Sequence, residues 1–188
     1  KMQNITYIQY VNRFIIMVIP AFDTVGNIPV GEYEPSLSEF KERFVNKFDK
    51  SKTRGILYKN YIKYNQSLST LGVAENEWVP GSFTSEKTDP EDIDILVYID
   101  GFLLVRKSKE YDFWTYFDPE MIYKYYSCHT HIVFKYPEGD PRDEHARHKR
   151  EYFENLFQKD WSGRPRGIVK FDLLAEQYIS DLKAEAEA

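Results

Sequence analysis

The chain has 188 residues, 42% hydrophobic and 29% charged, so we expect one compact domain with a substantial core, and a wholly disordered chain is excluded. With 25 Lys and Arg against 30 Asp and Glu, the net charge of −5 argues against duplex DNA as a partner. Cys128 is the only cysteine, which excludes an internal disulfide and is typical of a cytoplasmic protein.

The most apolar early run, residues 14–19, is much shorter than the ~20 residues that a membrane span needs, so we expect no membrane partner. It is predicted to be a strand that ends at Pro20. This divides the chain into an N-terminal extension over residues 1–18, a main domain over 19–174 and a C-terminal helical tail over 175–188.

Two helices are expected early in the main domain. Ser36 and Glu39 form a capping-box pattern, which predicts that a helix begins there. A second helix is predicted from about Thr53 to Leu71, where Gly72 would end it in a left-handed conformation.

The later elements alternate between strands and helices, which predicts an α/β (α+β) fold with a small mixed sheet flanked by helices. In chain order, we expect a short apolar stretch at 78–80, a strand at 93–99, a helix from Asp118, a strand at 128–136, a long helix from Asp140, a strand at 168–173 and the terminal helix. In the long helix, Phe153, Phe157, Tyr152 and Leu156 are expected to face inward.

The chemically informative stretch lies between residues 78 and 95. Asp92 and Asp94 stand two apart at the start of a strand, so both carboxylates should point to one face, where they could bind Mg²⁺. Gly81 and Ser82 precede them, and a glycine allows backbone to approach a phosphate closely while serine adds donors. Together they indicate phosphoryl or nucleotidyl transfer.

Each feature has an ordinary structural explanation. A Gly-Ser pair is common in turns, and an Asp-x-Asp pair is often simply solvated. The combination, nine residues apart and followed by an apolar strand, favours function over chance.

Gly81-Ser82, nine residues and then Asp92-Ile93-Asp94 resemble the signature of the polymerase-β-like nucleotidyltransferase superfamily, including its minimal branch. With the segments 20–31 and 163–169, the chain looks like an uncharacterised family of small bacterial proteins in that superfamily. The resemblance implies a nucleoside triphosphate bound at Gly81 and Ser82, and Mg²⁺ or Mn²⁺ bound by Asp92 and Asp94.

The chain departs from that pattern at the third carboxylate, which the superfamily usually places on the strand after the intervening helix. The matching strand, residues 128–136, has no acid but places His129 and His131 on one face, so one of them could act as the base or as a metal ligand. We expect this face to meet Asp94 and the paired carboxylates to keep the nearby histidine protonated. Asp172 is a second candidate if its strand lies beside the strand of Asp94.

Two functions follow. The first is metal-dependent transfer of a nucleotidyl group from a nucleoside triphosphate to a protein, an RNA or a small molecule. The second is a catalytically degenerate subunit that binds a protein partner encoded nearby, as in toxin–antitoxin or phage-defence systems. The missing third acid and the aromatic excess, 16% of residues, favour the second.

Overall fold

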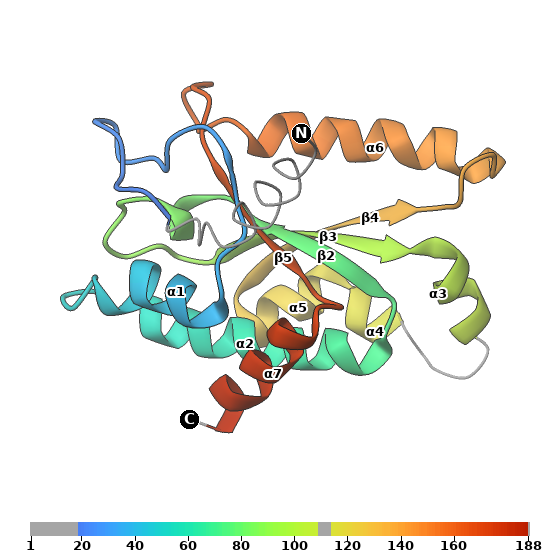
Figure 1. Ribbon diagram of the computed structural model, residues 1–188, viewed down its shortest axis with the longest axis horizontal. Helices are drawn as coiled ribbons and strands as arrows, with labels where there is room; N and C mark the ends of the chain where they lie inside the picture. The colour runs from blue at the N-terminus through green and yellow to red at the C-terminus, as the bar shows by residue number, and fades with distance from the viewer. Residues whose placement is uncertain (1–18, 109–113, 188) are drawn as a thin grey trace, which may run out of the picture.

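The computed structural model describes residues 19–108 and 114–187, so the expectations for the N-terminal extension lie outside the described residues. A five-stranded sheet in the order β1-β5-β2-β3-β4 forms the centre of the molecule (Figure 1). It is mixed, because β1/β5 and β3/β4 pair in parallel and β2 pairs antiparallel with both β5 and β3. The strands are β1 (Glu32–Tyr33), β2 (Ala74–Val79), β3 (Ile93–Asp100), β4 (Cys128–Lys135) and β5 (Ile168–Asp172).

Helices cover both faces of this sheet, which confirms the expected α/β fold class. Figure 1 shows α6 (Pro141–Phe157) on one face and α1, α2, α5 and α7 on the other. The helices of the second face and the short segments are α1 (Leu37–Lys41), η2 (Glu42–Asn46), α2 (Arg54–Leu71), η3 (Ser82–Thr84), α3 (Gly101–Lys107), α4 (Trp114–Phe117), α5 (Pro119–Tyr126) and α7 (Glu176–Glu187). None of the helices in the described ranges is both long and apolar enough to cross a bilayer.

The helix boundaries follow from local chemistry. Ser36 and Glu39 form the expected capping box, in which the Ser36 side chain accepts from the Glu39 amide and the Glu39 carboxylate accepts from the Ser36 amide. Gly72 ends α2 in the left-handed region, with φ 56°. Asp118 and Asp140 are the N-caps of α5 and α6, and a proline follows each. These four predictions are confirmed.

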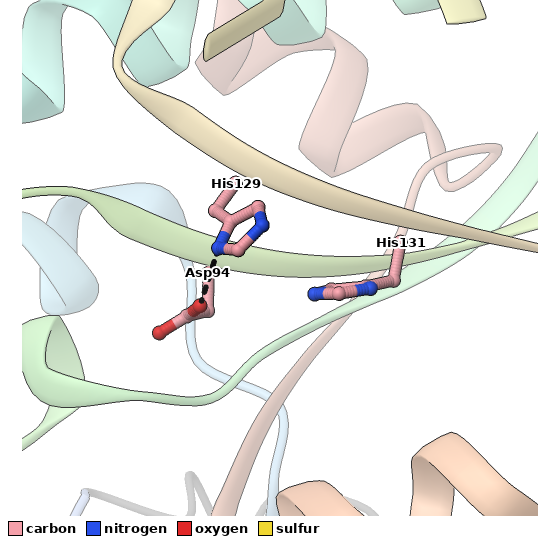
Figure 2. A group of neighbouring side chains, drawn as sticks. All are labelled: Asp94, His129 and His131. Atoms are coloured by element: carbon pink, nitrogen blue, oxygen red, sulfur yellow. Dashed lines mark ion pairs between the residues drawn. The ribbon is translucent and has the colours of Figure 1, made fainter. Parts of the chain in front are cut away.

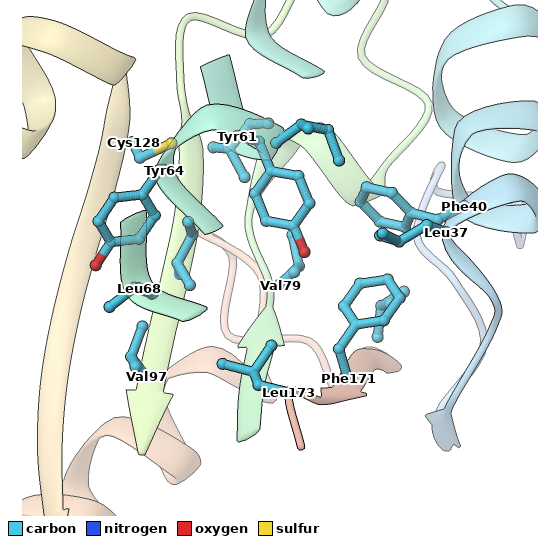
Figure 3. Packing of buried hydrophobic residues seen from close by; sticks show 14 of the residues in the cluster. Leu37, Phe40, Tyr61, Tyr64, Leu68, Val79, Val97, Cys128, Phe171 and Leu173 are labelled. Carbon is cyan, nitrogen blue, oxygen red and sulfur yellow. The ribbon is translucent and has the colours of Figure 1, made fainter. Parts of the chain in front are cut away.

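The larger core lies between the sheet and the helices of the second face, where α2 packs over the sheet (Figure 3). It is rich in aromatic residues because Phe40, Tyr61 and Phe171 pack with ring centroids 5–6 Å apart. A smaller cluster beneath α6 contains Trp78, Leu96, Tyr98, Val133 and Ile168. Most of the aromatic excess is therefore used for packing.

Besides β1 and α4, which were not predicted, three elements differ from the expectations. β2 begins at Ala74, four residues before the apolar stretch, because its polar residues are paired within the sheet. Helix α3 was not predicted, although Asp100 caps it by accepting from two backbone amides. Of the four α6 residues expected to face inward, Phe153 and Phe157 do so, whereas Tyr152 and Leu156 are exposed. The expectation for those two residues was wrong because only a narrow stripe of side chains on α6 faces the sheet.

The terminal helix α7 packs against α1 and α2 rather than standing apart from the domain. Tyr178 and Leu182 are buried in the larger core, and Glu185 forms an ion pair with Lys41 at 2.7 Å. The packing is continuous across residue 174, so α7 contributes to the fold of the main domain.

Candidate functional site

The parallel pairing of β3 with β4 brings the predicted aspartate and histidines together. Asp94 is in register with His129, and Leu96 with His131. Because side chains alternate along a strand, Asp94, His129 and His131 lie on the α6 face (Figure 2). His129 Nδ1 lies 3.7 Å from Asp94 Oδ1, and one donor atom from each of the three residues lies within 4.8 Å of the others. The expectation that this face meets histidines is confirmed.

Gly81 packs directly against the Asp94 carboxylate. Its backbone has φ 78°, which favours glycine, and a Cβ added here would overlap Asp94 Oδ2 and stand 2.7 Å from Asp94 Cγ. Any side chain at position 81 would therefore displace the carboxylate. The predicted Gly-Ser turn and the predicted strand aspartate form one local structure.

The environment of Asp94 favours its protonated form. Burial raises the pKa of Asp94 to about 6, and the charge of Asp92 adds to this effect, while His129 and Arg166 oppose it. The Asp94 side chain still keeps 21% of its surface exposed. It is therefore a partly buried carboxylate that a cationic ligand would stabilise in its ionised form.

His131 lies deeper than His129 and is held by aromatic rings. Its ring centroid is 4.7 Å from that of Phe153 and 5.1 Å from that of Phe157, both on α6. Burial lowers the pKa of His131 to about 4, and the charges of His129 and Lys149 act in the same direction. The expectation of a protonated histidine is therefore wrong for His131, which is neutral and a weak base at neutral pH.

A cavity of about 570 Å³ lies at the end of the sheet where β3 begins, and its lining includes Ser82, next to Gly81, but none of the three residues of this group. Three loops far apart in the sequence line it, at residues 25–27, 82–87 and 160–166, and Figure 1 shows them gathered at one end of the sheet. They overlap the three segments whose sequences carry the family resemblance. Ser82 is half-buried in the wall, and its hydroxyl makes no hydrogen bond with another residue in the described ranges.

Arg166 is the buried cation of this cavity, with 5% of its surface exposed. Its Nη2 donates to Thr84 O at 3.1 Å and to Thr84 Oγ1 at 2.9 Å, whereas its Nε has no partner among the described residues. Burial lowers its pKa, and the nearby charge of Asp94 partly offsets this. Because a buried cation with an unused donor is costly, this position favours an anionic ligand.

Sequence reasoning missed Arg54, which has no exposed surface at the start of α2. Its guanidinium donates to the carbonyl oxygens of Phe44, Phe83, Ser85, Lys87 and Thr88. It also stacks on Phe48, with Cζ 3.7 Å from the ring centroid. Arg54 therefore holds the loop that follows Ser82. An arginine at a helix N-terminus, where the helix dipole disfavours a cation, was the available signal.

Trp161 was also missed. It is fully exposed at the edge of the cavity, next to the turn that contains Arg164. Arg164 forms an ion pair with Asp160 at 2.7 Å. The other two cationic residues of the cavity lining, Arg166 and Lys87, form no ion pair with Asp160.

The other two predicted acids are placed differently. Asp92 immediately precedes β3 and acts on Asp94 through its charge, but it is not part of the three-residue group. Asp172 lies on β5, and β2 lies between β5 and β3. Asn76 of β2 is paired with Asp172 on one side and with Tyr98 of β3 on the other. The structure therefore does not bring Asp172 to Asp94, because the condition that their strands be neighbours is not met.

The donors around Asp94 do not match an all-oxygen magnesium site. Mg²⁺ is bound through carboxylates, phosphates and water in octahedral geometry, whereas the donors nearest to Asp94 are imidazole nitrogens. Imidazole is a ligand of transition metal ions instead.

The comparisons with known proteins identify a family without a described activity. No curated protein and no solved structure matches the chain. A family model described as a family of unknown function, DUF6932, matches residues 20–172 and thus includes the strands β1 to β5, the cavity loops and the Asp94 group. The chain belongs to this family of unknown function.

Proposed function

We propose that the chain binds a nucleoside triphosphate in the cavity beside Asp94 and transfers its nucleotidyl group to a protein, an RNA or a small molecule. The observation that carries this proposal is the packing of Gly81 against Asp94. It joins the Ser82 turn, which lines a cavity containing the buried Arg166, to a partly buried carboxylate. Nucleotidyl transfer needs such a combination of phosphate binding and charge control.

The residues of the cavity suit the parts of a nucleotide. Arg166 and Ser82 both line the cavity, each has a donor without a partner in the described structure, and a guanidinium and a hydroxyl both suit phosphate oxygens. The exposed ring of Trp161 offers a face on which a base stacks. Lys87 adds a second positive charge at the opening.

In this reaction an acceptor hydroxyl attacks the α-phosphorus, a new P–O bond forms, and the bond to the β-phosphate breaks to release pyrophosphate. The acceptor proton must pass to a base. Asp94, the carboxylate beside the phosphate-binding turn, would help to hold the divalent cation, which lowers the pKa of a bound hydroxyl so that water can take the proton. Such transfer requires a divalent cation to neutralise the phosphates, and Mg²⁺ and Mn²⁺ are the ions to compare.

The test is incorporation of an α-labelled nucleotide into an acceptor. The purified chain is incubated with each of the four nucleoside triphosphates, with Mg²⁺ or Mn²⁺, and with a cell extract as the source of acceptors. We expect one labelled product and release of pyrophosphate, and Asp94→Asn should reduce labelling by at least about 100-fold. Asp172→Asn is the matched control because the same change is made on an exposed carboxylate of β5.

Equal labelling by wild type and Asp94→Asn, with equal melting temperatures, would overturn the proposal. Nucleotide binding without transfer would instead support the degenerate, partner-binding function. That function is favoured by the absence of a third acid from the group around Asp94 in the described structure. Copurification with the product of a neighbouring gene would then test it directly.

A further inference from the structure

We propose that Asp94, His129 and His131 bind one divalent transition metal ion of the Zn²⁺ or Co²⁺ type, in preference to Mg²⁺. The inference deepens the proposed function by naming the ion of the same site, and it rests on the geometry of the β3/β4 pair. His131 is then a metal ligand rather than a base.

The three donors are close enough to share an ion after small side-chain rotations. A tetrahedral ion with bonds of 2.0–2.1 Å separates its donors by roughly 3.3 Å. His129 Nδ1 and Asp94 Oδ1 are 3.7 Å apart, and the whole set lies within 4.8 Å (Figure 2). The side chains project from adjacent parallel strands, so the backbone already sets their spacing.

The two imidazoles are free to bind metal. Across the described ranges, neither His129 nor His131 forms a hydrogen bond with another residue, and the nearest polar contact is the one between His129 and Asp94. His131 is oriented by the rings of Phe153 and Phe157, which hold it by packing alone. Its ring nitrogens therefore remain available as ligands.

Three ligands from the protein leave coordination positions open. Catalytic zinc sites have this composition, with three protein ligands and one position for water or substrate. The His129 side chain is 52% exposed, so an ion can enter from solvent, and Gly81 connects Asp94 to the turn that lines the cavity. The open positions are thus suited to a phosphate oxygen of the nucleotide.

The preference over Mg²⁺ follows from the donor types. Two nitrogen ligands strengthen binding of Zn²⁺ and Co²⁺, while Mg²⁺ prefers oxygen and loses its water reluctantly. The site therefore differs from the all-carboxylate arrangement that the resemblance implies.

The experiment uses the metal alone, without nucleotide, and the full chain without a histidine tag. After removal of bound metal by a chelator, the protein is titrated with Co²⁺ and the visible absorption is followed, and then Zn²⁺ or Mg²⁺ is added as competitor. We expect one Co²⁺ per chain, displacement by one equivalent of Zn²⁺, and an affinity for Mg²⁺ at least about 100-fold weaker.

The variants locate the site. His129→Ala and His131→Phe should each weaken Co²⁺ binding more than about tenfold, and the phenylalanine keeps the ring packing against α6. The His145→Ala/His148→Ala double variant removes two exposed histidines of α6 and should bind like wild type. Melting temperatures of the metal-free variants check that each is folded.

Unchanged binding in the His129 and His131 variants, or equal affinity for Mg²⁺ and Zn²⁺, would overturn the inference. The loss of binding in the control variant would do the same. Because no nucleotide is present, any of these results leaves the proposed nucleotidyl transfer untouched, and a failure of transfer leaves the metal result untouched.

Discussion

Arg54 and Arg166 are both buried guanidinium groups that bind the loop after Ser82, but they use their donors differently. Arg54 donates to five carbonyl oxygens through all three of its nitrogens. Arg166 donates to Thr84 through Nη2, and its Nε is without a partner in the described part of the chain. Burial alone does not separate a structural arginine from a binding arginine, whereas an unused donor on an arginine that lines a cavity does.

A second contrast, of access to solvent, exists between two carboxylates with raised pKa values. Glu77 has no exposed surface in the larger core, where Tyr61 and Asn65 donate to its Oε1. Asp94, on the next strand, points to the other face and is open to His129 and to solvent. Glu77 Oε2 has no hydrogen-bond partner among the described residues, but it is buried where no ligand reaches it, whereas Asp94 is open to a ligand.

The largest expected effect is the loss of stability when Arg54 is replaced. Arg54→Met leaves five carbonyl oxygens without their donor, so we expect the free energy of unfolding to fall by about 4 kcal/mol. Urea denaturation measures this. Arg164→Met, which removes an exposed arginine from the other side of the same cavity, is the control and should change stability by less than about 1 kcal/mol. A similarly small effect of Arg54→Met would contradict its structural role.

The next effect concerns Glu77 and pH. Burial raises the pKa of Glu77 from 4.5 to about 7, against the opposing hydrogen bonds from Tyr61 and Asn65. Between these values the folded state keeps a proton that the unfolded state has lost, so stability is greatest below about 4.5 and falls as the pH rises through 7.

Glu77→Gln should therefore be more stable than wild type at pH 8, by roughly 3 kcal/mol at most, and equal to it near pH 4.5. Thermal and urea unfolding across this pH range measure the difference. The raised pKa of Asp94, about 6, likewise makes the stability of wild type fall as the pH rises, and Asp94→Asn should remove that contribution. A parallel pH profile in Glu77→Gln and wild type would show that Glu77 does not titrate in this range.

The smallest effect on stability, and the most specific, is expected for Arg166. Arg166→Met should change the stability of the free protein by less than about 1 kcal/mol, because it removes a buried charge together with only two hydrogen bonds. Tripolyphosphate at 100 times its dissociation constant should stabilise wild type by about 2.7 kcal/mol and leave this variant unchanged. Equal stabilisation of both by tripolyphosphate would place the anion elsewhere.

Most of the fold could be predicted because its signals are local. The capping box at Ser36, the left-handed Gly72 and the Asp-Pro pairs before α5 and α6 each act within a few residues. The polar part of β2 could not be predicted, since the buried Glu77 is stabilised by side chains remote in the sequence, among them Tyr61 and Asn65 of α2, which lie 16 and 12 residues away.

The site could be predicted in part. The alternation of β4 and its expected position beside β3 were sufficient to bring the histidines to Asp94. The cavity could not be derived in the same way, because it is formed by three loops whose approach depends on the sheet order. The separation of Asp172 from Asp94 has the same cause, as β2 inserts between their strands.

The contact between Gly81 and Asp94 has a consequence for the history of the family. Since position 81 has no space for a side chain while the carboxylate is in place, a substitution there requires position 94 to change as well. We therefore expect positions 81 and 94 to vary together among the members of the family. Relatives that keep both residues and relatives that have lost both can then be separated by reading two letters of each sequence, before any of them is purified.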